Sequence, residues 1–180
     1  MNPKKRLLLT INLLGGAAVL GSYAGGIRTH PNAVNVLWGG VPASIQPFYT
    51  AGMFLAAAGY FAILYFILFR LDPDKTSVWH RSGFDTFNVL FAAILIPSSL
   101  WMPLTFAAVE ATSGVLLWVV RLVLAAVGLA SLGLLTALLN TQPRRPLWAY
   151  WLALIGCAAF CLQTAVLDMI VWSAYFTVYN

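Results

Sequence analysis

The sequence predicts an all-α membrane protein, a bundle of five transmembrane helices that forms one domain over residues 1–180. The composition gives the first indication: 61% of the residues are hydrophobic and 8% are charged, whereas a soluble globular chain has about 25% charged residues. The mean hydropathy is +0.85. Several apolar runs exceed about 18 residues, which is enough to cross the ~30 Å hydrocarbon layer of a bilayer. Alternating segments of ~10 residues, the pattern of a membrane β-barrel, are absent from the sequence.

Five apolar segments are the expected spans. The first follows Lys4, Lys5 and Arg6 and resembles a signal peptide, but its apolar run exceeds the usual 7–15 residues, so we expect a retained helix; cleavage is the alternative. Short polar connections separate the other four segments, and Arg144 and Arg145 precede the last one. The predicted spans are residues 7–26, 45–69, 84–108, 114–139 and 147–175.

The distribution of basic residues predicts the orientation. Eight of the ten lysines and arginines flank spans on one side of the membrane, and they are Lys4, Lys5, Arg6, Arg70, Lys75, Arg81, Arg144 and Arg145. Arg28 is on the opposite side and Arg121 is inside a span. The positive-inside rule then places the N-terminus in the cytoplasm and the C-terminus outside. We expect an integral protein of a bacterial inner membrane. This distribution also explains the net charge of +5 without a nucleic-acid partner.

Two charged residues lie within predicted spans, Arg121 in the fourth and Asp168 in the fifth. A charge at the bilayer centre costs at least ~2.5–3.5 kcal/mol on insertion scales, so each needs a partner or water. At 1.5 Å per residue both lie roughly 27–31 Å from the inner end of adjacent antiparallel helices. We therefore expect an ion pair between Arg121 and Asp168. This pair either pins two helices together or forms the polar floor of a pocket.

The third span contains Trp101 between Pro97 and Pro103. Each proline removes a backbone hydrogen bond and kinks a helix, and Trp101 is too deep for an interfacial position. An indole presented into the bundle is a candidate pocket wall; packing alone is the alternative. We expect the hydroxyl groups of Ser98 and Ser99 to bond to the preceding turn.

The long first loop, residues 27–44, contains Trp38 and is a candidate lid or binding loop. In the first span, Ala17, Gly21 and Gly25 form a stripe of small residues that would let a helix of this chain or of a second protein approach closely. Cys157 and Cys161 are four residues apart on one helical face, where a disulfide would strain the helix, so we expect free apolar thiols.

These features together resemble the translocator protein family, also called tryptophan-rich sensory proteins. The segment Trp101-Met102-Pro103-Leu104-Thr105-Phe106 is similar to a Trp-x-Pro-leucine/valine-x-Phe stretch in the third span of that family. Pro47-Phe48-Tyr49-Thr50 is similar to its Pro-Val-Trp-Thr motif, with Tyr49 in place of tryptophan. Ala165-Val166-Leu167-Asp168 is similar to Ala-x-x-Leu-Asn, one residue shorter and with aspartate for asparagine, and Tyr179-Asn180 is similar to a later Leu-Asn. This sequence lacks the loop signature Pro-Ser-Trp-x-Pro-Pro of the family, and Arg121 has no counterpart in the family. The resemblance implies five spans and a pocket under the first loop that binds porphyrins or sterols.

We expect a non-enzymatic membrane receptor or carrier for a hydrophobic, partly anionic small molecule such as a tetrapyrrole, sterol or lipid. Trp38 belongs to the lid, three residues form aromatic walls (Tyr49, Trp101 and Trp172), and Arg121 and Asp168 form the floor. We expect no cofactor and no metal, since His30 and His80 are in loops and the sequence has no Cys/His cluster. One alternative is an accessory subunit of a larger membrane complex, and another is an isomerase-type lipid enzyme that uses Asp168. The chain could also form a homodimer.

Overall fold

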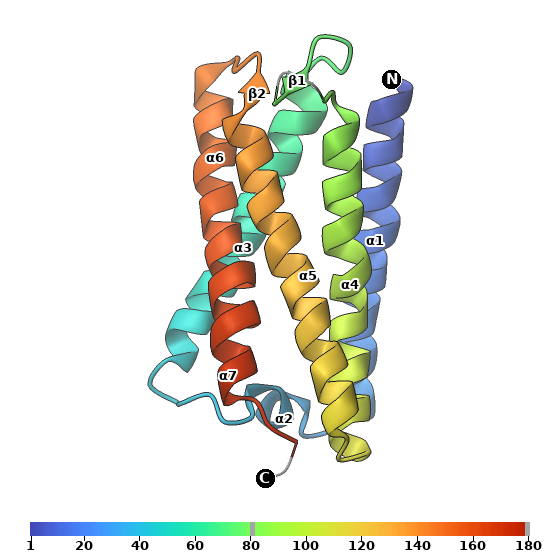
Figure 1. Cartoon of the computed structure of the whole chain (residues 1–180), viewed down its shortest axis with the longest axis vertical. Helices are drawn as coiled ribbons and strands as arrows, with labels where there is room; N and C mark the ends of the chain where they lie inside the picture. Colours follow the sequence, from blue (N-terminus) through green and yellow to red (C-terminus); the bar gives the residue numbers. More distant parts are fainter. Residues whose placement is uncertain (80–81, 179–180) are drawn as a thin grey trace.

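The computed structural model describes residues 1–79 and 82–178, and these form an up-and-down bundle of long helices (Figure 1). Five helical spans in this part of the chain are long and apolar enough to cross a membrane: Pro3–Thr29, Gln46–Arg70, Asp85–Glu110, Gly114–Leu139 and Leu147–Tyr175. The protein is therefore an integral membrane protein with an all-α fold, as the sequence predicts.

The elements within these spans are more varied than uniform α-helices. The first, third and fourth spans are single helices, α1 (Pro3–Thr29), α4 (Asp85–Glu110) and α5 (Gly114–Leu139). The second continues from α3 (Gln46–Tyr65) into a π-helix, η1 (Phe66–Arg70). The fifth consists of α6 (Leu147–Cys161), the π-helix η2 (Leu162–Trp172) and α7 (Ser173–Tyr175). The observed bounds differ from the predicted ones by at most four residues, the largest difference being at Pro3.

Helix neighbours in the bundle do not follow the order of the sequence. The first span, α1, packs on α4, which packs on α5; α5 in turn packs on α6 and η2, and α6 packs on α3. The N-terminal half of α1 meets the C-terminal half of α3, where the Tyr60 hydroxyl donates a hydrogen bond to Asn12 Oδ1, and the two helices diverge toward the opposite end (Figure 1). We call the end with the N-terminus, β1 and β2 the N-terminal end, and the end with α2 and α7 the C-terminal end.

Small residues permit the closest helix contacts. Gly59 of α3 and Gly156 of α6 face each other so closely that a Cβ added at Gly59 would collide with the Gly156 backbone. A Cβ at Gly128 of α5 would lie 3.2 Å from the Ala165 Cα of η2. Lipid supplies no hydrophobic force between helices, so close backbone packing of this kind stabilises membrane bundles.

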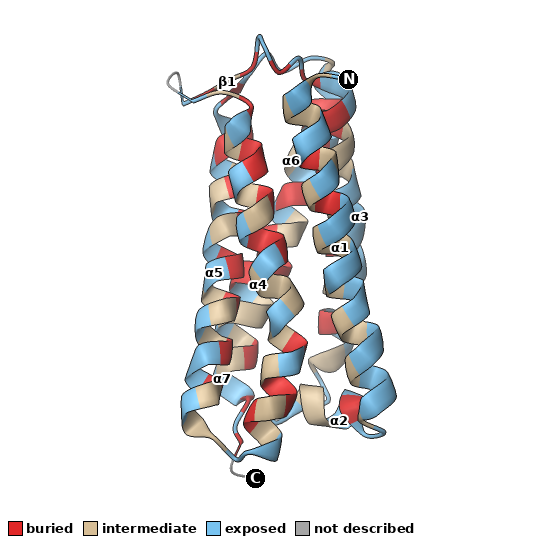
Figure 2. Cartoon of the chain, turned by 90° about the vertical axis from the view of Figure 1, so that its right-hand side faces the viewer, coloured by how far each residue is buried: buried red, intermediate tan, exposed pale blue. Residues whose placement is uncertain are grey.

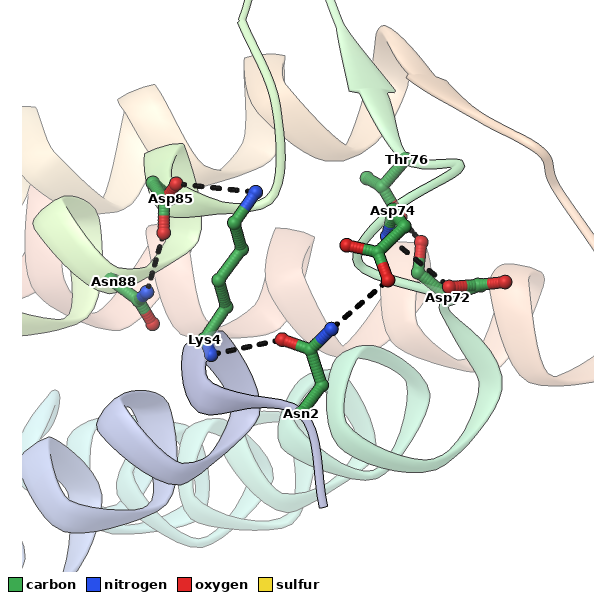
Figure 3. Close-up of polar contacts among 7 residues, drawn as sticks. All are labelled: Asn2, Lys4, Asp72, Asp74, Thr76, Asp85 and Asn88. Carbon is green, nitrogen blue, oxygen red and sulfur yellow. Dashed lines mark hydrogen bonds and ion pairs between the residues drawn. The ribbon is translucent and has the colours of Figure 1, made fainter.

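Polar contacts join α1 to the loop and helix beside it at the N-terminal end (Figure 3). Asn2 Nδ2 donates a hydrogen bond to Asp74 at 3.1 Å, and Asn2 Oδ1 caps α1 by accepting from the Lys4 amide at 3.0 Å. The Lys4 Nζ lies 3.5 Å from the Asp85 carboxylate at the start of α4. A short antiparallel pair, β1 (Ser77–Val78) and β2 (Thr141–Gln142), connects the two loops at this end. His80 and Arg81 lie outside the described residues.

The burial pattern fits a lipid environment. Buried residues line the inside of the bundle, and large apolar side chains such as Leu20, Phe54 and Trp118 are exposed on its outside (Figure 2). Helix α1 is peripheral, because only 11% of its most apolar 18-residue segment is buried inside the bundle, against 28–39% for the corresponding segments of the other four spans. A Cβ added at Gly21 or Gly25 of the small-residue stripe would have no atom within 4 Å, so the described helices leave this stripe open.

Helix α4 passes both prolines without a break. Ser98 Oγ donates a hydrogen bond to the Ile94 carbonyl and Ser99 Oγ to the Ile96 carbonyl, each at 2.7 Å. The predicted bonding of these hydroxyl groups to the preceding turn is confirmed. The helix therefore stays intact while it carries Trp101 into the bundle.

Candidate functional site

The first loop covers the C-terminal end of the bundle. It forms a short helix, α2 (Ala33–Trp38), followed by Gly39 and Gly40. Gly39 has a φ of +52°, a value that favours glycine, and a Cβ there would lie 2.6 Å from the Phe176 ring. Trp172 Nε1 donates a hydrogen bond to the Leu37 carbonyl at 2.8 Å. The loop is thus attached to the end of the fifth span.

Four predicted aromatic residues come together beneath this loop, and they come from α2, α3, α4 and η2. Trp38 meets Tyr49 edge-on, with ring centroids 5.7 Å apart. Trp101 meets Trp172 in the same way at 5.8 Å, and Trp172 stacks on Phe176 at 4.1 Å. Apart from the stacked Phe176, these are the perpendicular arrangements that aromatic pairs favour. We call Trp38, Tyr49, Trp101, Trp172 and Phe176 the aromatic cluster.

Sequence reasoning missed Tyr23, which extends this cluster to α1. Its ring lies 5.9 Å from that of Trp101 at an angle of 66°. Tyr23 is the only aromatic residue of α1. That isolation is the signal that could have identified it, because a single aromatic residue among small ones marks one face of a helix.

Asp168 lies within η2, which packs on α3 and α5. Its Oδ1 accepts a hydrogen bond from Gln163 Nε2 at 2.8 Å, and Gln163 lies against Gly52 of α3. The Tyr49 hydroxyl donates to the Leu167 carbonyl. Asp168 is half-buried. The carboxylate therefore belongs to the same region as the aromatic cluster.

The π-helical backbone explains why Gln163 and Asp168 meet. In an α-helix, residues three and four apart share a face, whereas the i→i+5 bonds of a π-helix bring residues five apart together. π-Helices occur mostly as single turns and frequently at functional sites, but η2 extends over 11 residues. Sequence reasoning assumed an α-helix and therefore missed Gln163.

The predicted ion pair between Arg121 and Asp168 is wrong. The guanidinium carbon of Arg121 lies 4.9 Å from the Trp118 ring centroid, and Nη2 donates to the Phe176 carbonyl at 3.4 Å. Among the described residues, no ion pair includes either residue. Counting residues predicts the depth of the two residues but not the direction of each side chain, and Asp168 bonds to Gln163 on its own helix instead.

Three buried polar atoms in this part of the bundle have no hydrogen-bond partner among the described residues, namely Trp101 Nε1, Gln163 Oε1 and Arg121 Nε. Gln163 is only 6% exposed, and a Cβ at Gly52 of α3 would lie 2.5 Å from its Oε1. An unsatisfied buried polar group costs about 1–3 kcal/mol. Such atoms are rare in native proteins and call for an explanation, of which a bound molecule is one.

No protein-family model, no curated protein and no solved structure matches this chain. The resemblance to the translocator protein family therefore stays a prediction. Of the residues that carry it, Tyr49, Trp101 and Asp168 lie in the region just described, whereas Tyr179 and Asn180 lie outside the described residues.

The aromatic side chains of this region pack against one another. Two open grooves lie on the described chain: one of about 490 Å³ beside Trp118 and Arg121, the other of about 810 Å³ at residues 142–147. The predicted free thiols are confirmed, since Cys157 and Cys161 are both buried and unpaired. The described residues contain no group of three or more metal-binding side chains.

Proposed function

We propose that this protein is a membrane receptor or carrier that binds a hydrophobic small molecule among the aromatic cluster, Asp168 and Gln163. The observation that carries the proposal is the pair of buried, unpartnered polar atoms, Trp101 Nε1 and Gln163 Oε1, in an aromatic setting. A ligand that bonds to them would remove a cost of about 1–3 kcal/mol per atom. Tetrapyrroles, sterols and other lipids are the classes that aromatic walls with a few polar groups accommodate.

The first loop is the proposed lid. Its attachment to the fifth span consists of the Trp172–Leu37 hydrogen bond and the contacts of Gly39 and Trp38. A single hydrogen bond contributes about 0.5–1.5 kcal/mol, so opening this loop costs little compared with unfolding a span. Because the aromatic side chains pack against one another, a ligand enters by displacing the loop or the half-buried Trp101.

Quenching of tryptophan fluorescence tests this function. Purified protein in a neutral detergent is titrated with a porphyrin, a sterol analogue and a pyrene-labelled lipid, and the wild type is compared with Trp101→Ala. The matched control is Trp151→Ala, because Trp151 is 55% exposed on the outside of α6. Saturable quenching that is weakened in Trp101→Ala and retained in Trp151→Ala supports the proposal. Quenching that never saturates, or that is equal in both variants, refutes it.

We further propose that the N-terminal end faces the cytoplasm of a bacterial inner membrane. Seven basic residues lie at or near this end, whereas Arg28 lies near the other. The seven are Lys4, Lys5, Arg6, Arg70, Lys75, Arg144 and Arg145. Single cysteines at Lys75 and Thr112 test the orientation in spheroplasts with an impermeant maleimide. Cys157 and Cys161 are buried and give little background. Labelling of Thr112→Cys alone is expected; labelling of Lys75→Cys alone would reverse the orientation.

An assembly subunit is the second candidate. The open stripe of Ala17, Gly21 and Gly25 on the peripheral helix α1 favours it, because such stripes mediate helix contacts in membranes. Native mass spectrometry of the gently solubilised protein distinguishes the two: a monomer with a bound small molecule supports the receptor, whereas constant co-purification with other subunits supports assembly.

A further inference from the structure

We infer that the ligand of this site carries a positively charged head group, such as the ammonium of an amphiphilic amine. This inference rests on the proposed function and makes it more specific. Arg121 lies beside Trp118 and donates to the Phe176 carbonyl at the end of the bundle, whereas Asp168 is the charged side chain that bonds to Gln163. The ligand is therefore expected to be cationic, whereas an arginine in the pocket floor would bind an anionic ligand.

The polar atoms around Asp168 are acceptors, whereas Trp101 Nε1 is an unpartnered donor of the aromatic cluster. Gln163 Oε1 is unpartnered, and the Asp168 carboxylate accepts one side-chain hydrogen bond among the described residues, at Oδ1. The Tyr49 hydroxyl donates its hydrogen bond to the Leu167 carbonyl. An ammonium group has donors and no acceptor, so it complements these oxygens, whereas a carboxylate would be repelled by Asp168.

The aromatic rings reinforce the same preference. The Trp101 ring lies within 6 Å of the rings of Tyr23 and Trp172, edge to face in both pairs. A cation within about 6 Å of an indole or phenol face is attracted by the ring quadrupole, and aromatic cages recognise ammonium groups in this way. A carboxylate beside several indoles is thus a combination suited to a lipophilic amine.

Hydrogen bonds and close contacts place Asp168 on the α3 side of the fifth span. Its partner Gln163 lies against Gly52 of α3, and the carbonyl of the neighbouring Leu167 accepts a hydrogen bond from Tyr49 of α3. The head group of an amphiphile would therefore bind where η2 packs on α3.

Three probes with one apolar body test the charge of the ligand: 1-pyrenemethylamine, 1-pyrenemethanol and 1-pyrenecarboxylate. Each is titrated into the protein in a neutral maltoside detergent, and energy transfer from tryptophan to pyrene reports binding. We expect the amine to bind about tenfold or more tightly than the alcohol, since its ammonium forms a charge-assisted hydrogen bond. The carboxylate is expected to bind more weakly than the alcohol.

Two variants assign the effect to Asp168. Asp168→Asn should weaken binding of the amine by about tenfold or more and leave the alcohol unchanged, and Asp168→Glu should restore part of the preference. Glu110→Gln is the matched control, because it makes the same chemical change at an exposed helix end and should have no effect.

The possible failures are distinguishable. If none of the three probes binds saturably, the proposed function fails together with the inference. If the alcohol or the carboxylate binds as tightly as the amine, or if Asp168→Asn affects all three probes equally, only the charge preference is refuted. The wild-type comparison requires no variant, so an unstable Asp168→Asn protein would not prevent the test.

Discussion

A single methyl group at Gly59 should separate α3 from α6 and destabilise the protein. A Cβ at Gly59 would lie 2.7 Å from the Gly156 carbonyl carbon and 2.8 Å from its Cα, and closer still to the carbonyl oxygen. Carbon atoms pack at about 3.5–4.0 Å, so the two helices must move apart by roughly 1 Å. No side-chain rotation can relieve a collision with backbone atoms. Overpacking of this kind costs about 1–3 kcal/mol.

Gly21→Ala is the matched control. The same substitution raises helix propensity by about 0.8–1.0 kcal/mol at either position, but a Cβ at Gly21 meets no atom within 4 Å. The difference between the two variants therefore isolates the overpacking term, about 1–3 kcal/mol. Unfolding in mixed detergent with increasing SDS, followed by tryptophan fluorescence, measures both variants. Equal free energies of unfolding for Gly59→Ala and Gly21→Ala would refute the close α3–α6 contact.

Three further predictions concern single polar contacts. A double-mutant cycle of Arg121→Gln and Asp168→Asn should give additive stabilities within about 0.5 kcal/mol, whereas coupling well above that would restore the ion pair. Tyr60→Phe should cost about 1–3 kcal/mol because it leaves Asn12 Oδ1 without its donor, and adding Asn12→Leu should recover part of that loss in SDS titrations. Trp172→Phe removes the donor to the Leu37 carbonyl, so proteolysis of the 31–44 loop should accelerate while Trp151→Phe leaves it unchanged.

The five spans could be predicted because a bilayer imposes one strong rule. A backbone in hydrocarbon must satisfy its own hydrogen bonds, so a long apolar run becomes a helix. Charged and polar residues mark the ends of these runs, and for this reason the predicted range 114–139 coincides with α5. Prolines do not disturb the prediction, since α4 continues through Pro97 and Pro103.

The directions of the side chains could not be predicted from the same information. Depth along a helix follows from counting residues, but the direction of a side chain depends on the helix type and on its neighbours. At Leu162 the fifth span changes to a π-helix, and its face after that point no longer follows the α-helical period. Asp168 therefore pairs with Gln163 on its own helix, and Arg121 extends to the Phe176 carbonyl at the end of the bundle.

The aromatic part of the site was easier to predict than the polar part. Position in a loop, a motif or an unusual depth predicts Trp38, Tyr49 and Trp101, and Trp172 is predicted as a further aromatic wall; the four rings meet in two pairs. Tyr23 was missed because α1 was interpreted as a small-residue surface.

The stability of Asp168→Asn separates a structural carboxylate from a functional one. Asparagine keeps an oxygen that accepts from Gln163 Nε2, so the 2.8 Å hydrogen bond can persist, and the substitution removes a half-buried carboxylate charge. Because Asp168 has no cationic partner among the described residues, we expect unfolding stability to be unchanged or to rise by about 1 kcal/mol. Binding of an amine probe should fall in the same protein. A stability loss above about 1 kcal/mol would instead show that the charge supports the fold, because a residue kept for binding is one whose removal the fold tolerates.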